Sequence, residues 1–267
     1  MLAGVKPVTH VHARESDLPA LTEVARRLRV KLLVFARTAG GEARLQVLLG
    51  ASEKNLRKTA ELWGREDVNP GRLLGYPACC MRAYEKHTDD TSGTDIVRAI
   101  ARRTKGAGRL PFLLNDVFYF YSRALAVQDG ARRQALLAAN PGVDLDLLNA
   151  ILWHPCSFRC PESRRKAERI WKTMKKVAPA LAGSLRFALA RPVLFWDWDR
   201  FAVLTRRGGP AFSYAGVEAP KSLLEAAPSA LLARGDRLVR AGKSFAVRKG
   251  DKTLGVLPGE PLLLNFS

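Results

Sequence analysis

The sequence predicts an α+β protein with a mainly helical central region, a small N-terminal α/β part and a β-rich C-terminal subdomain. Apolar residues recur at helical spacing through the middle of the chain. Short strand-like runs separated by glycine turns fill the last third. We therefore expect a domain over residues 1–190 that contains the helical region, and a β-rich subdomain over residues 191–267.

The N-terminal third alternates between helix and strand patterns. Ser16–Arg29 has helical spacing behind a serine that can cap the helix. Lys31–Ala36 and Ala43–Leu49 are apolar runs of strand type, and the Gly40-Gly41 dipeptide between them is typical of a hairpin. Ser52–Arg65 returns to a helical pattern. Together these elements predict a small α/β unit.

The remaining elements follow from the same two periodicities. Helices are expected at Pro77–His87, Thr94–Lys105, Asp116–Val127, Ala131–Ala139, Asp144–Trp153 and Pro161–Val177. Strands are expected at Pro192–Trp196, Arg200–Thr205, Ala211–Tyr214, Arg237–Ala241, Ser244–Arg248, Thr253–Leu257 and Leu262–Phe266, with one helix at Lys221–Ala233.

Composition narrows the classes of partner. The 267 residues include 44 Lys and Arg against 25 Asp and Glu, a formal charge of +19. Such an excess favours encounter with polyanions, so nucleic acid or an acidic protein partner is expected, although a genome-wide compositional bias would give the same excess. No segment approaches the roughly 20 apolar residues of a membrane helix, and the N-terminus does not resemble a signal peptide. We expect a cytoplasmic protein that does not enter a membrane.

The four cysteines of the sequence form two compact motifs. Cys79 and Cys80 follow Pro77, while Cys156 and Cys160 lie in a segment that ends at Pro161. Proline is favoured at helix starts, so both groups are expected at helix N-termini, where the macrodipole stabilises thiolates. Four thiols in two pairs match a tetrathiolate metal site, and cytosolic chains rarely keep disulfides.

Adjacent cysteines and the Cys160-Pro161 pair favour a [4Fe–4S] cluster over zinc, because a cubane offers a separate iron corner to each thiolate. The cluster would have a redox or catalytic role, as in an iron–sulfur-dependent oxidoreductase or a sulfur-handling enzyme. A zinc-stabilised basic nucleic-acid-binding protein is the alternative, and a thiol enzyme that uses Cys79 or Cys160 is a third class. Four unrelated thiols would be the simplest explanation.

Polar residues near the cysteines are candidates for tuning the site. Those that could donate hydrogen bonds to sulfur or move protons are His154, Tyr76, Arg82, Ser157, Arg159 and Ser163. The helix expected after Cys160 also carries a basic face, which could bind phosphates or remain solvated. Its residues are Arg164, Arg165, Lys166, Arg169 and Lys172.

The two motifs resemble those of an uncharacterised prokaryotic family, a domain of unknown function with GYPxCC and HxPCSxxCxxS segments. Here the first stands at Gly75–Cys80 and the second at His154–Ser163, with His154 directly before Pro155 as a departure from the pattern. The resemblance covers the region between the motifs. It implies that the four cysteines, His154 and Ser163 act as a set, and it implies no activity.

Overall fold

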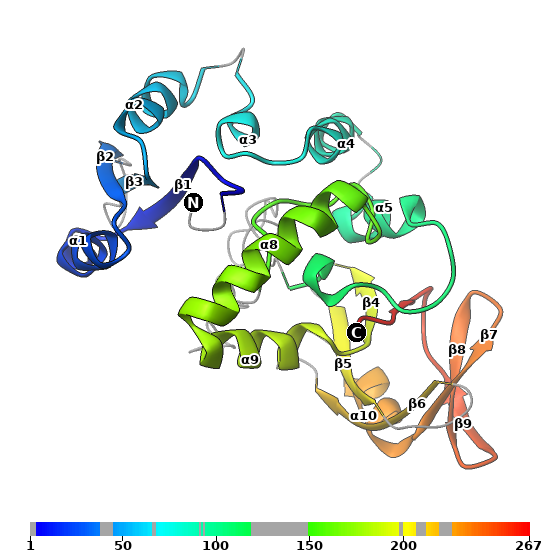
Figure 1. Ribbon diagram of the computed structural model, residues 1–267. Coiled ribbons are helices and arrows are strands. Elements are labelled where there is room, and N and C mark those ends of the chain that lie inside the picture. The colour runs from blue at the N-terminus through cyan, green and yellow to red at the C-terminus, as the bar shows by residue number, and fades with distance from the viewer. Residues whose placement is uncertain are drawn as a thin grey trace.

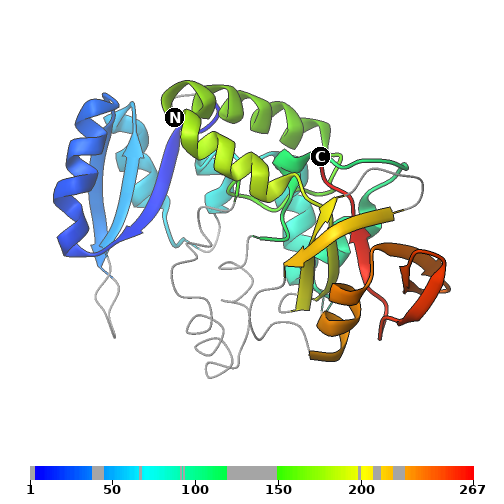
Figure 2. The same ribbon diagram turned by 90° about the horizontal axis from the view of Figure 1, so that it is seen from below.

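The computed structural model describes residues 4–37, 45–65, 68–90, 92, 94–118, 149–197, 200–206, 212–218 and 226–267. The N-terminal strands and the C-terminal hairpins lie at opposite ends of the molecule (Figures 1 and 2). Between them lie the helices that carry the cysteines, together with the helices that follow them in the chain. These are α4 (Ala78–Thr88), α5 (Ile96–Arg103), α8 (Pro161–Val177) and α9 (Pro179–Leu189).

The N-terminal unit is an antiparallel sheet of three strands in the order β1-β3-β2. The strands are β1 (Val8–Ala13), β2 (Lys31–Arg37) and β3 (Leu45–Gly50). A 3₁₀ turn at Glu15–Asp17 leads into α1 (Leu18–Arg27), and α2 (Glu53–Leu62) follows β3.

Alternation along β3 explains why this small sheet needs a helix on each side. Leu45 and Val47 pack with Leu18 and Leu21 of the α1 region. Leu48, on the other face, packs with Leu56 of α2. Successive strand residues point to opposite faces, so the two helices cover the two sides of one sheet.

A seven-stranded antiparallel sheet fills the other end, in the order β10-β4-β5-β6-β7-β8-β9. Its strands are β4 (Val193–Asp197), β5 (Arg200–Arg206), β6 (Phe212–Glu218), β7 (Arg237–Ala241), β8 (Ser244–Lys249), β9 (Lys252–Val256) and β10 (Leu262–Leu264). Helix α10 (Ala226–Arg234) precedes β7. Leu232 of α10 is fully buried in the core beneath this sheet.

Strand β4 contributes to two separate cores. Val193 and Phe195 join the core formed by the central helices. Leu194 and Trp196 join the core beneath α10. The first core therefore crosses the expected boundary between residues 190 and 191, and the two parts of the chain pack against each other. Whether they are separate domains stays a prediction.

The α+β class is confirmed, but the expected concentration of helices in the centre is wrong. Helices α1, α2 and α10 lie outside it, and short helices at Pro70–Leu73 (α3) and Phe112–Leu114 (3₁₀) were not predicted. The predicted helix at Asp144–Trp153 fails where it can be compared, because residues 149–153 are not helical. Ala131–Ala139, most of Asp116–Val127 and the Gly40-Gly41 turn lie outside the described residues.

Candidate metal centre

Three segments bring the four cysteines together. Cys79 and Cys80 occupy the first turn of α4, which begins directly after Pro77. Cys160 is the N-cap of α8, where its sulfur accepts a hydrogen bond from the Ser163 amide at 3.4 Å. Cys156 lies in the loop that precedes α8 in the chain. Cys79, Cys80 and Cys160 are therefore found at helix N-termini as expected, and Cys156 lies in the loop before one.

The four sulfur atoms form a compact group. Ligand atoms of Cys79, Cys80, Cys156 and Cys160 all lie within 4.8 Å of one another. Three of the sulfur pairs are separated by 3.9 Å (Cys79–Cys80), 3.6 Å (Cys79–Cys160) and 3.7 Å (Cys80–Cys160). All four cysteines are free thiols, and Cys80 and Cys160 are buried. The donor set can hold a metal.

Cys160 has a lowered pKa, whereas Cys80 and Cys156 have raised pKa values. A hydrogen bond from the Cys80 thiol, with further bonds from Ser163, lowers the pKa of Cys160 to about 4. The pKa of Cys80 is raised, because its thiol donates to Cys160 and is buried. Burial raises the pKa of Cys156 to about 12. A metal that binds all four sulfurs must therefore displace protons from the other thiols.

A buried chain of polar contacts supports Cys80. Ser163, which is fully buried, places its Oγ 3.0 Å from the Cys80 sulfur. The indole Nε1–H of Trp153 donates to the same Oγ at 2.9 Å. The amide of Cys156 donates to the Cys80 sulfur at 3.2 Å. Hydrogen bonds of this kind orient a ligand and tune its basicity.

Helix α5 holds the loop that carries Cys156. The Arg103 Nε–H donates to the Cys156 carbonyl at 2.8 Å. The amide of Phe158 donates to the Thr104 hydroxyl at 2.9 Å, and the Phe158 ring packs edge-to-face on Phe266. This loop is thus fixed by the end of α5 and by the C-terminal residues.

The other residues expected near the sulfurs have different partners. The Tyr76 ring contacts Trp153, and Arg82 is exposed on α4. The Ser157 hydroxyl accepts from the Arg159 amide, and the Arg159 guanidinium donates to the carbonyls of Ala107 and Arg109. Only Ser163 of the six has a side-chain contact to sulfur among the interactions recorded for the described residues.

His154 belongs to a second buried polar group. Its Nδ1 lies 2.7 Å from the Asp116 Oδ2, and both side chains are almost fully buried. The Tyr84 ring stacks on the imidazole with the centroids 5.3 Å apart. This pair could not be predicted, because Asp116 lies 38 residues from His154 in the chain and only the fold brings them together.

Part of the basic face of α8 is used in contacts within the protein. Arg164 and Arg165 form ion pairs with Glu168 and Glu162, one turn away on the same helix. The Lys166 ammonium donates to the Gly75 carbonyl at 2.6 Å and so joins α8 to the segment before α4. Arg169 and Lys172 lie on exposed positions of the helix.

Comparisons with protein-family models, curated proteins and solved structures find no match. None of the helices in the described ranges is both long and apolar enough to cross a membrane. The site must therefore be interpreted from its own geometry.

Proposed function

We propose that this protein is a zinc-stabilised nucleic-acid-binding protein, in which Cys79, Cys80, Cys156 and Cys160 hold one zinc ion. The spacing of the sulfurs is the observation that carries the proposal. Zinc binds thiolates at about 2.3 Å, so a tetrahedral site separates its sulfurs by about 3.8 Å. The separations among the sulfurs of Cys79, Cys80 and Cys160, which are 3.6, 3.7 and 3.9 Å, agree with this value. The Cys156 sulfur lies within 4.8 Å of the other three.

A cubane fits this spacing less well. In a [4Fe–4S] cluster each thiolate binds a different iron, so the distance between irons is added to the separation of the sulfurs. The ligand segments would have to move apart to admit it. The iron–sulfur prediction therefore takes second place to its zinc alternative.

The ion would have a structural role. Four protein thiolates fill a tetrahedral site and leave no position for substrate, whereas catalytic zinc sites keep one open. The ion would join the start of α4 to the segment of Cys156 and Cys160 before α8, since Cys80 and Cys160 are 80 residues apart in sequence. When bound, zinc supplies a cross-link among these segments.

The nucleic-acid part of the proposal rests on the charge of the C-terminal hairpins. Arg237 on β7 pairs directly with Arg248 on β8, and Lys249 pairs with Lys252 on β9. Like charges on directly opposed strand residues are destabilising. Asp236 lies 3.9 Å from the Lys249 ammonium and offsets only part of this charge. A polyanion such as the phosphate backbone would relieve the repulsion.

Two measurements test the proposal. Elemental analysis of purified protein should find one zinc per chain. The double variant Arg237→Gln/Arg248→Gln should bind a short single-stranded RNA more weakly than the wild type, with a salt dependence shallower by up to about 1.4 units of slope if each arginine neutralises one phosphate. Equal weakening by Arg26→Gln/Arg57→Gln, which removes the same charge from α1 and α2, would contradict a role for the hairpins.

An iron–sulfur cluster is the second candidate, favoured by one observation. Cys79, Cys80 and Cys160 all lie at helix N-termini, which stabilise the negative charge of a cluster. Anaerobically purified protein would then be coloured, contain iron with inorganic sulfide, and be bleached by dithionite. A redox or sulfur-handling activity, with an acidic protein partner, belongs to this candidate. Colourless protein with stoichiometric zinc would rule it out.

A further inference from the structure

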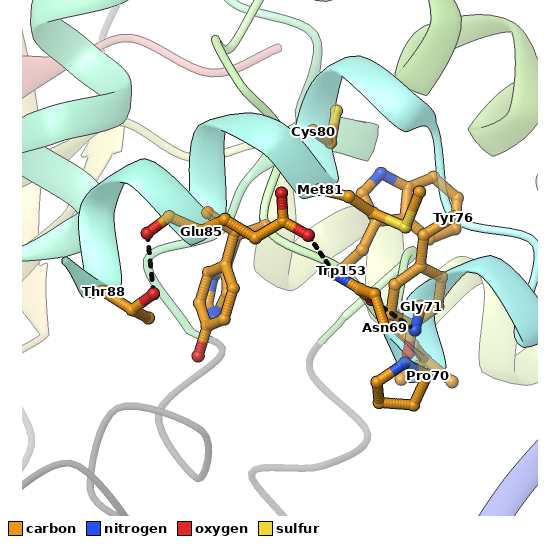
Figure 3. A pocket seen from close by; sticks show the side chains of 12 residues that line it. Asn69, Pro70, Gly71, Tyr76, Cys80, Met81, Glu85, Thr88 and Trp153 are labelled. Carbon is orange, nitrogen blue, oxygen red and sulfur yellow. Dashed lines mark hydrogen bonds between the residues drawn. The ribbon is translucent and has the colours of Figure 1, made fainter. Parts of the chain in front are cut away.

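A pocket of about 320 Å³ lies beside the cysteine group, on another side of α4. Tyr76, Met81, Tyr84 and Trp153 supply much of its lining. Cys80 also lines it, but in Figure 3 its sulfur points away from Glu85. The pocket is therefore adjacent to the proposed metal centre. A cavity of this size and aromatic character suits a flat heterocycle.

The pocket lining carries little of the positive charge of the protein. The chain has a formal charge of +19. Among the lining residues in the described part of the chain, Glu85 is the only carboxylate, His154 is the only basic side chain, and there is no Lys or Arg. The buried Lys6 ammonium lies 5.2 Å from the centroid of the Tyr76 ring. Phosphate and carboxylate groups are disfavoured in such a site. The chemistry favours a neutral ligand that donates hydrogen bonds.

Glu85 is an exposed residue at the edge of the pocket and has an oxygen available for such donors. Its Oε1 accepts from the Asn69 Nδ2 at 2.5 Å, and Asn69 is itself fixed by the Gly71 amide (Figure 3). Its Oε2 has no recorded hydrogen bond within the described ranges. A carboxylate has about four acceptor positions, so both oxygens can still receive an N–H group.

We infer that this pocket binds a guanine base. Guanine has two adjacent N–H donors, N1–H and the N2 amino group, which match one carboxylate. Adenine and cytosine have a ring-nitrogen acceptor beside their amino group, and uracil has carbonyls on both sides of its single N–H. Each of these bases would place an acceptor against Glu85. The aromatic lining residues would bury the faces of the base.

The inference deepens the proposed function, because a polynucleotide held by the basic hairpins would be the source of the base. It commits the pocket to an unstacked guanine. It does not require the metal to contact the base. Trp153 links the two sites, since it lines the pocket and donates to Ser163, which contacts Cys80.

Free nucleosides test the pocket directly. Binding of guanosine, inosine and adenosine to the zinc-loaded protein should be measured by calorimetry, with choline as a probe for an aromatic cation site. We expect guanosine to bind at least about tenfold more tightly than adenosine, with inosine between them because it lacks the N2 amino group. Glu85→Gln should remove the preference for guanosine. Glu61→Gln, an exposed carboxylate on α2, should leave it unchanged.

Several results would overturn the inference. These are equal affinities for the three nucleosides, tightest binding of choline, no nucleoside binding up to the solubility limit, or an intact guanosine preference in Glu85→Gln. The wild-type comparison of guanosine with inosine decides the matter even if that variant misfolds. Zinc content is measured on the same samples. Zinc-loaded protein without guanosine binding would refute the pocket alone, while protein without zinc would refute the proposed metal centre.

Discussion

Replacing Ser163 with alanine should expose how strongly the metal-binding region depends on its buried hydrogen bonds. Ser163 is fully buried, and its hydroxyl accepts the Trp153 indole N–H at 2.9 Å. Ser163→Ala leaves that N–H buried without its partner, which costs about 1–3 kcal/mol. The contact to Cys80 is lost as well. We therefore expect the free energy of unfolding to fall by about 2 kcal/mol.

A double-mutant cycle separates this loss from simple packing. Trp153→Phe removes the indole N–H, so Ser163→Ala should cost less in that background. The coupling between the two changes should be about 1 kcal/mol. Urea unfolding followed by far-UV circular dichroism, at pH 7.5 with equal zinc content, would measure all four free energies of unfolding.

Ser157→Ala is the matched control. Ser157 lies in the same loop, is not fully buried, and accepts only a long hydrogen bond of 3.4 Å from the Arg159 amide. Its loss should change stability by less than about 0.5 kcal/mol. Additivity of Ser163→Ala and Trp153→Phe within about 0.3 kcal/mol would refute the role assigned to the indole–hydroxyl bond.

Three further outcomes are expected. Burial lowers the pKa of Lys6 from 10.5 to about 8, so Lys6→Met should stabilise the protein by about 2 kcal/mol at pH 7 after allowance for the lost cation–π contact. In urea unfolding this gain should shrink between pH 8 and 10.5, because the Lys6 ammonium of the folded wild type loses its proton in that range; a constant gain would contradict the prediction. Zinc affinity, measured by chelator competition, should rise at least about 100-fold per pH unit between pH 6 and 8, because the thiols of Cys80 and Cys156 have raised pKa values and each must lose a proton to bind. A zinc affinity that does not change with pH would contradict this prediction. A Cβ on Gly235 would lie 2.2 Å from the Val247 Cγ1, so Gly235→Ala should lower the thermal midpoint by several degrees or prevent folding, whereas Gly183→Ala, with open space around it, should not.

Local signals predicted much of the secondary structure. Pro161 and the basic periodicity that follows it fixed the bounds of α8, and the glycine turns separated β7, β8 and β9. Strand β1 was missed, because Val8–Ala13 is interrupted by two histidines and does not alternate simply between apolar and polar residues. Its identity as a strand comes from pairing with β3 along its whole length.

The convergence of the cysteines could be predicted because all four fall into two compact motifs, and the prolines beside them predicted their place at helix N-termini. The pocket could not. Its polar residues Asn69, Glu85 and His154 come from separate segments, and no spacing in the sequence relates them. The sequence also could not reveal that Lys166 is used inside the protein, because an inward lysine on a basic helix has the same periodicity as an exposed one.

The last residues of the chain complete the support of the cysteine loop. Leu110 exchanges backbone hydrogen bonds with Asn265 and Ser267, and Phe266 packs against Phe158 beside Cys156. During synthesis, the loop therefore emerges from the ribosome more than 100 residues before the segment after β10 that secures it. Until residues 265–267 have emerged and packed, the loop that carries Cys156 lacks these contacts, so the four thiols cannot yet be held in their final arrangement.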